Sequence, residues 1–120
     1  MKEHFLPYDL SIELKEIGFN DKCLGHYVPT KSGGKLIISS EYGDDICGAP
    51  VWEQVFDWFR NTHNLHIMFI DDYKKKFSFK IIQMDKVTWS YKSDIYLSYK
   101  KIRELSVSKL IEFIGDPTKF

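Results

Sequence analysis

The sequence has no segment that would cross a membrane or direct export. None of its apolar runs approaches the roughly 20 residues that a membrane-spanning helix needs. No apolar stretch precedes Pro7 and Asp9, as it would in a signal peptide. Cysteine is scarce: in a reducing compartment we expect Cys23 and Cys47 to remain small buried thiols rather than to pair. These absences predict a cytoplasmic protein with no membrane partner.

Motifs of known catalytic sites are also missing. The chain contains no Gly-rich phosphate loop, no G-x-S-x-G and no H-E-x-x-H sequence. A thiolate pair of Cys47 with His63 or His66 has no local support. The acidic pairs Asp44-Asp45 and Asp71-Asp72 lie in predicted turns, where such pairs are common, so they do not indicate a divalent-cation site. We therefore expect no enzymatic activity and no cofactor.

Two histidine-containing pairs have the spacing of zinc ligands. Cys23-x2-His26 and His63-x2-His66 each resemble half of a tetrahedral site, but His26 and His63 lie 37 positions apart. His63 is predicted at the end of a helix and His66 on a strand, so the two do not share a helix face. We expect structural histidines and no metal.

What is present indicates a folded domain with uneven charge. The chain has 120 residues, 43% of them hydrophobic and 16% aromatic, which is enough to bury a core. Its net charge is zero, yet residues 1–59 hold 5 Lys and 10 Asp or Glu, whereas residues 60–120 hold 12 Lys or Arg and 7 Asp or Glu. Such a split either marks a basic face for an acidic partner or reflects two ordinary solvated surfaces.

The heaviest apolar pattern lies between Ala49 and Arg60. At about 100° per residue, six large residues fall in one arc and polar residues take the opposite side. The apolar arc consists of Val51, Trp52, Val55, Phe56, Trp58 and Phe59. This pattern predicts an amphipathic helix that anchors the core, with Pro50 at its first helical position.

The other elements follow from local patterns. A first helix is predicted from Pro7 to Gly18, and a contact between Phe19 and Leu14 would close it as a Schellman motif. The last helix begins after Ser98 as the N-cap. Strands are predicted at residues 23–29, 35–40, 65–70, 77–81 and 87–91.

Two of these strands carry more specific expectations. Pro29 cannot donate to a ladder, which places the first strand at an edge or ends it there. Residues 65–70 are apolar on both alternating faces apart from His66, which predicts an interior strand that has a layer on each side or is at least well covered. The order is then α-β-β-α-β-β-β-α, a single α+β domain over residues 1–120 with a mostly antiparallel sheet.

The start of the last helix is basic. Lys100 and Lys101 fall in its first turn, where cations oppose the helix dipole. With Arg103 and the unpaired backbone N–H groups, they would form a phosphate-binding corner. A second contact would come from Lys74, Lys75 and Lys76. The alternative is that these lysines lie on a solvent-facing surface and are tolerated there.

Several short motifs are spread over both ends and the middle of the chain. They are Pro7-Tyr8-x-Leu10, Leu14-Lys15-Glu16-Ile17-Gly18-Phe19, Ala49-Pro50, Phe56-Asp57-Trp58-Phe59-Arg60, Asn64-Leu65-His66, Tyr99 and Lys109-Leu110-Ile111-Glu112. This set resembles a family of small uncharacterised proteins that bacteria, their phages and mobile elements encode, and the Trp-Phe-Arg helix is its most distinctive part. The resemblance implies a phage or mobile-element setting and no mechanism. Lys100-Lys101 departs from the acidic residues that the family would have there.

From Pro50 onward, the predicted order of helix, three strands and helix is similar to a double-stranded-RNA-binding domain. Ser98 to Arg103 would fall at the basic helix start of that domain. Its Gly-rich strand-to-helix junction and Ala-rich final helix are missing. Our first hypothesis is a non-enzymatic protein-binding or accessory module with an unknown protein partner or self-association. The alternative is binding of RNA or DNA through the basic C-terminal half.

Overall fold

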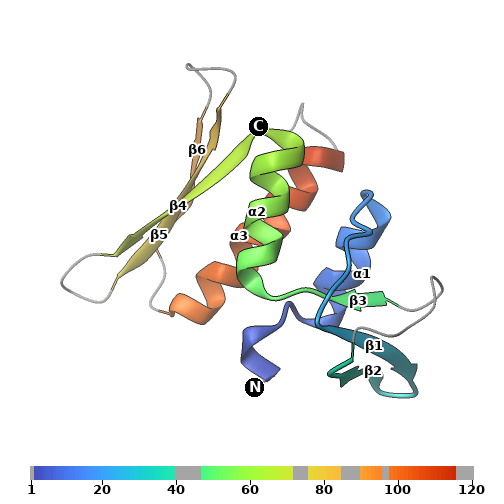
Figure 1. Ribbon diagram of the computed structural model, residues 1–120. Coiled ribbons are helices and arrows are strands. Elements are labelled where there is room, and N and C mark those ends of the chain that lie inside the picture. Colours follow the sequence, from blue (N-terminus) through green and yellow to red (C-terminus); the bar gives the residue numbers. More distant parts are fainter. Residues whose placement is uncertain (1, 40–46, 72–75, 85–89, 96–97, 116–120) are drawn as a thin grey trace. The chain divides into compact units, whose positions relative to one another are not determined.

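The structure is a computed structural model that describes residues 2–39, 47–71, 76–84, 90–95 and 98–115 (Figure 1). The described part of the chain is α+β, with three α-helices and two antiparallel three-stranded sheets, as the sequence predicts. It divides into two compact units, Met1–Val55 and Phe56–Phe120, and the boundary falls within the central helix. The prediction of a single domain stays a prediction.

The first helix, α1 (Tyr8–Glu16), ends as predicted. The N–H of Gly18 donates to the Lys15 carbonyl at 3.1 Å, and the N–H of Phe19 donates to the Leu14 carbonyl at 3.2 Å. Gly18 has φ +111°, which suits a residue without a Cβ. These are the two bonds of a Schellman motif, and the side chains of Leu14 and Phe19 are both buried behind it.

The sheet of the first unit has the order β2-β1-β3. Its strands are β1 (Gly25–Thr30), β2 (Gly33–Ile37) and β3 (Cys47–Ala49). Of the two alternatives given for the strand with Pro29, the edge position is wrong, because β1 is the central strand, whereas β1 does end next to Pro29, at Thr30. The described pairing of β1 with β3 covers only Gly25–Tyr27. Pro29 lies beyond these residues, so its missing N–H takes no hydrogen bond away from β3. The short strand β3 was not predicted; residues 40–46 of the preceding loop lie outside the described residues.

The core of the first unit packs α1 against this sheet. Its buried residues are Phe5, Tyr27, Cys47 and Ala49. The hydroxyl of Tyr27 donates to the Leu6 carbonyl at 2.6 Å, which satisfies the polar end of a buried ring. Both cysteines are buried free thiols, as predicted.

The central helix, α2 (Trp52–His63), starts later than predicted. Pro50 is not its first residue: Pro50 is buried, and Val51 forms an isolated β-bridge with Phe5. A 3-10 turn, η1 (Lys2–His4), lies at the start of the chain. The Trp52 indole Nε1 donates to the Glu3 carbonyl in this turn at 2.9 Å, which keeps the Trp52 backbone at the helix start. His63, predicted at the end of a helix, is the last residue of α2.

The second unit contains a meander sheet of order β4-β5-β6 followed by a long helix (Figure 1). The elements are β4 (Leu65–Asp71), β5 (Phe77–Gln83), β6 (Ser90–Lys92) and α3 (Tyr99–Gly115). Ser98 is the N-cap of α3, as predicted, because its Oγ accepts the Lys101 N–H at 3.3 Å. Trp89 and the beginning of the predicted third strand lie outside the described residues.

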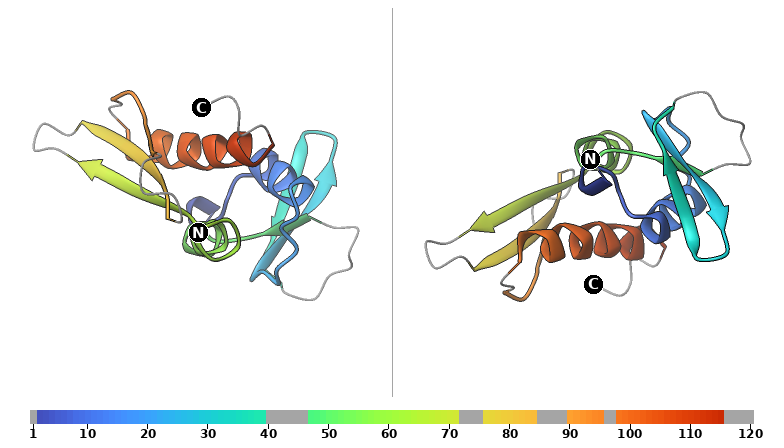
Figure 2. Two further views of the ribbon diagram at one scale, coloured as in Figure 1. Left: turned by 90° about the horizontal axis from the view of Figure 1, so that it is seen from above. Right: turned by 90° about the horizontal axis from the view of Figure 1, so that it is seen from below.

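One face of this sheet carries the core of the second unit. The ring of Phe69 on β4 contacts both Phe56 of α2, at 5.5 Å between centroids, and Tyr99 of α3, at 5.6 Å. Since Phe69 meets both helices, α2 and α3 cover the same face, and Figure 2 shows α3 beside the sheet. The interior position predicted for residues 65–70 is wrong. β4 is an edge strand, because an apolar run does not reveal where a strand lies in its sheet.

Candidate binding face of the second sheet

The face of the β4-β5-β6 sheet that is opposite α2 and α3 is called here the outer face. Side chains of a strand alternate between the two faces, so the pairing register assigns them. The residues of the outer face whose side chains are described are His66, Met68, Ile70, Ser78, Lys80, Ile82 and Lys92. This is a mixture of apolar, hydroxyl and basic side chains, and none of these residues is acidic.

Two lysines stand directly opposite each other on this face. Lys80 on β5 pairs with Lys92 on β6, and on its other side Lys80 pairs with Met68 on β4. Like charges at directly opposed positions destabilise a sheet, because the two side chains are close on the same surface. The described residues form no ion pair with Lys80 or Lys92. The fold therefore holds two positive charges together without an anion of its own.

Large apolar side chains are exposed beside these lysines. Met68 is 45% exposed and Ile70 is 39% exposed. Single exposed apolar residues are normal, but a group of them next to charges is typical of an interaction surface. The outer face thus combines basic and apolar contacts in one place.

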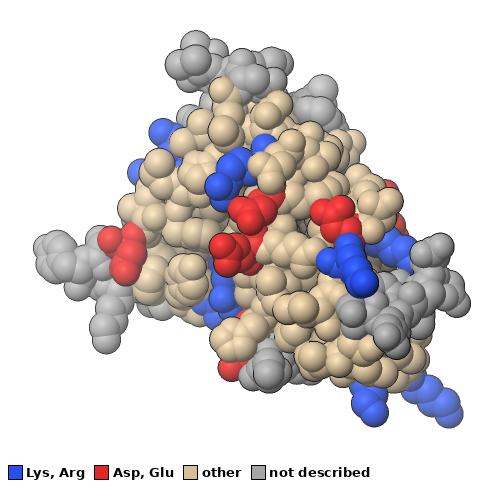
Figure 3. All heavy atoms as spheres, in the orientation of Figure 1, with Lys and Arg blue, Asp and Glu red and all other residues tan. Residues whose placement is uncertain are grey.

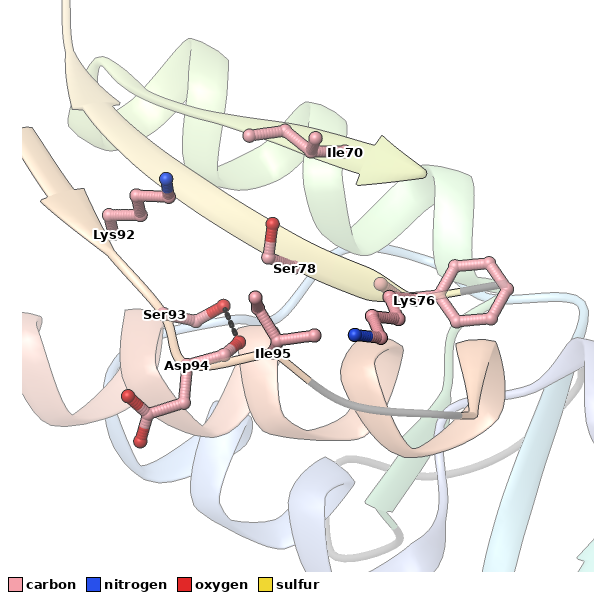
Figure 4. Close-up of a pocket in the computed structure, with 8 residues that line it drawn as sticks. Ile70, Lys76, Ser78, Lys92, Ser93, Asp94 and Ile95 are labelled. Atoms are coloured by element: carbon pink, nitrogen blue, oxygen red, sulfur yellow. Dashed lines mark hydrogen bonds between the residues drawn. The ribbon is translucent and has the colours of Figure 1, made fainter. Parts of the chain in front are cut away.

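A pocket of about 470 Å³ opens at one end of the outer face (Figure 4). The lining residues come from the ends of the three strands and from the segment after β6. They are Ile70, Lys76, Phe77, Ser78, Lys92, Ser93, Asp94 and Ile95. In Figure 4, Lys92 and Lys76 lie on opposite sides of Ser78, and Ile70 and Ile95 flank it above and below. Apolar walls and polar groups that converge from several elements are the general features of a binding pocket.

The wall of the pocket after β6 is fixed by Ser93. Its Oγ accepts the N–H of Phe79 at 2.8 Å and donates to the carbonyl of Asp94 at 2.8 Å, while its own N–H donates to the Phe79 carbonyl at 2.9 Å. Buried polar groups that are fully hydrogen-bonded rigidify the structure around them. Ser93 is therefore a structural residue, and it holds the backbone of Asp94 beside β5.

Ser78 differs from Ser93 in having no such partners. The Ser78 residue as a whole is only 6% exposed. The described residues form no hydrogen bond with its hydroxyl, which faces the pocket. Its oxygen is nevertheless not among the buried atoms that lack a hydrogen-bond partner, so water can reach it. Ser78 is thus a solvent-reachable hydroxyl on the lining of the pocket.

The basic residues predicted from the sequence are found in different surroundings. Lys100 and Lys101 are exposed in the first turn of α3. The Lys101 N–H is already bound by Ser98 Oγ, so that amide is not free for a phosphate. The guanidinium of Arg103 lies 5.6 Å from the centroid of the Tyr99 ring. Lys76 lines the pocket, and Lys74 and Lys75 lie outside the described residues.

Two titratable groups outside this face have shifted pKa values. Burial raises the pKa of the Cys47 thiol, although nearby Lys15 opposes this; an activated thiol requires the opposite shift. Burial also lowers the pKa of His63. Among the described residues, no group of three or more His, Cys, Asp or Glu side chains could hold a metal. No helix in the described ranges is long and apolar enough to span a membrane.

Basic and acidic side chains are both present on the face drawn in Figure 3. Part of this mixture is local: Arg60 and Asp57 on α2 form an ion pair at 3.2 Å. The informative positive charge is instead the small group of lysines on the outer face.

Comparison of the chain with protein-family models, curated proteins and solved structures gave no match. The order α2, β4, β5, β6, α3 is the order of a double-stranded-RNA-binding domain, but no structural match supports that likeness. The outer face itself was not predicted. Its residues alternate in the sequence, but only the register shows that Lys80 and Lys92 are neighbours.

Proposed function

We propose that this protein is a non-enzymatic binding module that docks a protein partner on the outer face of its β4-β5-β6 sheet. The observation that supports this most strongly is the cross-strand pair of Lys80 and Lys92, which has no acidic partner among the described residues. A pair of like charges costs stability. An acidic partner that neutralises both lysines on binding would recover that cost.

The apolar residues of the outer face favour a polypeptide over a nucleic acid. Met68 and Ile70 are aliphatic and exposed, and they adjoin the lysines. Nucleic-acid surfaces use dense basic residues with aromatic rings on which bases stack, and none of the described residues of the outer face is Phe, Tyr or Trp. A segment in which acidic and large apolar side chains alternate complements Lys80, Lys92, Met68 and Ile70 together. A phage or mobile-element setting, implied by the motif resemblance, is part of this proposal.

The test is affinity capture from the native host with matched variants. A tagged wild-type protein should retain a specific partner, whereas Lys80→Glu and Met68→Asp should each reduce the captured amount by about tenfold or more, as substitutions at the centre of an interface do. Lys31→Glu is the control, because Lys31 is exposed in the β1-β2 turn of the first unit. A partner captured equally by all four proteins would reject the outer face as the docking surface.

Self-association is distinguished in the same experiment. Sedimentation of the purified protein should show either no dimer or a dimer that Lys80→Glu does not dissociate. A concentration-dependent dimer sensitive to both substitutions, with no other captured protein, would assign the outer face to a second copy and contradict the proposal.

Nucleic-acid binding is the second candidate, and one observation favours it. Lys76, Lys100 and Lys101 are all exposed in the second unit, and the helix start that carries two of them is the element that double-stranded-RNA-binding domains use. The check is an anisotropy titration with duplex and single-stranded RNA and DNA at about 50 mM salt, where non-specific binders reach micromolar affinity. We expect no binding. Binding that Lys100→Gln with Lys101→Gln weakens equally for all sequences would establish this function instead.

A further inference from the structure

The open edge of strand β4 carries a more specific inference, which rests on the proposed docking function. We infer that the partner binds as an extended segment that adds a strand to this edge, antiparallel to β4. Acidic and apolar side chains alternate in that segment. Its acids lie on the outer face near Lys80, and its apolar side chains lie near Ile67 and Phe69 on the opposite face, called here the inner face. Main-chain hydrogen bonds then supply affinity, and the side chains supply specificity.

The backbone groups of β4 point alternately toward β5 and toward the open edge. In an antiparallel pair, residues that exchange hydrogen bonds alternate with residues whose N–H and C=O groups point away from the partner strand. The Met84 N–H donates to the Asn64 carbonyl at 2.8 Å, and these two residues continue the β4-β5 register by one step. The even-numbered residues of β4 therefore bond to β5. The odd-numbered residues, among them Ile67, Phe69 and Asp71, direct their N–H and C=O groups to the open edge.

These edge groups have no hydrogen-bond partner in the part of the chain that the structure describes. The sheet order places β4 at the edge, and Figure 2 shows it as the outermost strand in both views. Among the described residues, none bonds to the backbone N–H or C=O groups of Ile67, Phe69 or Asp71. A row of such groups is a template on which another strand can pair.

β4 also lacks the features that keep other edge strands from pairing. Natural edge strands are short, or they carry lysine, proline or a bulge. At the other edge of this sheet, β6 comprises only Ser90–Lys92 among the described residues and ends in a lysine. In contrast, β4 spans seven residues without lysine or proline, and its register with β5 has no bulge. Met68 and Ile70 on β4 are exposed as well. This long, apolar and unprotected edge is therefore a site for strand pairing.

The inner face is incompletely covered at the same edge. On β5, Phe79 and Ile81 are each 1% exposed, whereas Ile67 and Phe69 on β4 are only half-buried. Phe56 of α2, whose ring packs on that of Phe69, is half-buried too. The apolar side chains of an added strand would lie beside Ile67 and Phe69 and remove them from water. Burial of apolar surface is the main favourable contribution to most protein association.

The outer face favours acids on the other side of the added strand. A residue opposite Met68 would lie roughly 10 Å from Lys80, two strand spacings away. The long side chains of Lys80 and a glutamate can meet across Met68, and Lys80 forms no ion pair with the described residues. A second copy of β4 would instead place His66, Met68 and Ile70 on this face, and none of these is acidic. Charge complementarity therefore favours a different polypeptide over a second copy.

The test uses a peptide probe and needs no identified partner. The probe is a capped peptide with the seven-residue length of β4, in which Glu and Val alternate. Titrated into the wild-type protein to about 2 mM, it should bind with a dissociation constant on the order of 0.1 mM. Amide hydrogen exchange at Ile67 and Phe69 should slow on binding, because their N–H groups become hydrogen-bonded. The amide of Met68, which already bonds to β5, should change little.

Matched peptides separate main-chain bonds from side-chain contacts. In the proposed register, the valine N–H groups donate to β4 and the glutamate N–H groups point to solvent. Methylation of the valine nitrogens should therefore weaken binding about tenfold or more. Methylation of the glutamate nitrogens should leave the affinity nearly unchanged. A peptide with Lys in place of Glu has the wrong charge for Lys80 and should bind much more weakly than the original.

Protein variants assign the ionic contact. Lys80→Gln should raise the dissociation constant of the Glu-Val peptide about two- to fivefold, as loss of an exposed ion pair does. Lys31→Gln is the control, because Lys31 is exposed in the first unit, and it should leave the dissociation constant unchanged. Well-dispersed amide spectra of both variants establish that each is folded.

Contrary results would overturn separate parts of the inference. No binding up to about 2 mM, equal affinity of the two methylated peptides, or binding without slower exchange at Ile67 and Phe69 would reject strand addition. Equal binding of the Glu and Lys peptides would reject the acidic segment. Slow exchange of the same amides that increases with protein concentration, in the absence of peptide, would assign the edge to a second copy and reject the proposed occupant.

These measurements read the backbone of the β4 edge, whereas host capture with Lys80→Glu and Met68→Asp reads the side chains of the outer face. Capture that depends on both side chains can succeed while every peptide fails, which would reject strand addition and leave the docking surface in place. The peptide can also bind as expected while capture finds no partner. Failure of this inference is therefore separable from failure of the proposed function.

Discussion

The ring of Tyr8 occupies the space that a side chain at Gly34 would need. A Cβ built on Gly34 would overlap the atoms of this ring. Tyr8 begins α1 and Gly34 lies in β2, so the contact joins helix and hairpin in the first unit. The same ring packs edge-on against Tyr27 of β1, with 5.3 Å between centroids. The absence of a side chain at Gly34 is thus what lets α1 approach the sheet.

Gly34→Ala should destabilise the protein by about 1–3 kcal/mol, the usual cost of overpacking a close contact. Urea denaturation measures it. The control is Gly115→Ala at the end of α3, where a Cβ meets nothing within 4 Å. If the overlap with Tyr8 is the cause, most of the loss should disappear when Gly34→Ala is made in a Tyr8→Ala background.

Trp58→Ala should destabilise by about 3–5 kcal/mol, because it empties a large buried aromatic site. Trp58 is 8% exposed and packs against Phe59 and His63, with 5.0 Å and 4.9 Å between ring centroids. Thermal unfolding measures this loss of stability. Arg60→Ala, which breaks an exposed ion pair with Asp57, is the control and should change stability by less than about 0.5 kcal/mol. A Trp58→Ala protein that melts within about two degrees of wild type would mean that this side chain is not part of the core.

His63 should make stability depend on pH. Burial lowers its pKa in the folded protein from 6.5, so the unfolded chain takes up the proton more readily. Stability from this group is therefore fully present above about pH 6.5 and is lost as the pH falls through 6.5 toward the folded pKa. The Nε2 atom has no hydrogen-bond partner among the described residues, so a leucine would lose no such bond.

His63→Leu should flatten the dependence, which unfolding free energies at about pH 7.5 and pH 5.5 will measure. The exposed Thr62 on the same helix provides a control: Thr62→Ala should keep the slope of wild type, because it removes no titratable group. An unchanged slope in His63→Leu would show that other groups cause the acid sensitivity.

Two kinds of substitution at the start of α3 should change the free energy of unfolding in opposite directions. Ser98→Ala removes the acceptor of the Lys101 N–H and should cost about 1 kcal/mol. Lys100→Gln with Lys101→Gln removes cations that oppose the helix dipole and should raise the free energy of unfolding by about 0.3 kcal/mol for each lysine. Urea denaturation of both variants checks the signs. A loss of stability in the double lysine variant would contradict the dipole explanation and indicate contacts made by the lysine stems.

Three helix ends were decided by the sequence, because the groups that cap them lie within a few residues, whereas the start of α2 was not. Gly18 with Phe19, and Ser98 ahead of α3, make the bonds that their spacing predicts. Asn64, placed after α2, has φ +57°, a conformation that asparagine tolerates. Free thiols and the α+β class likewise follow from composition and local pattern.

Sheet positions were decided only by tertiary structure. Pro29 lies in a central strand, and residues 65–71 form an edge strand, because strand order depends on partners distant in the chain. The same holds for the candidate site. Twelve positions along the chain separate Lys80 from Lys92, and Ser78 reaches its pocket beside Lys76 and Lys92 only when β5 and β6 pair. A strand pattern fixes which face a side chain takes, whereas the register that sets its neighbours is chosen by the turns and packing of the whole sheet.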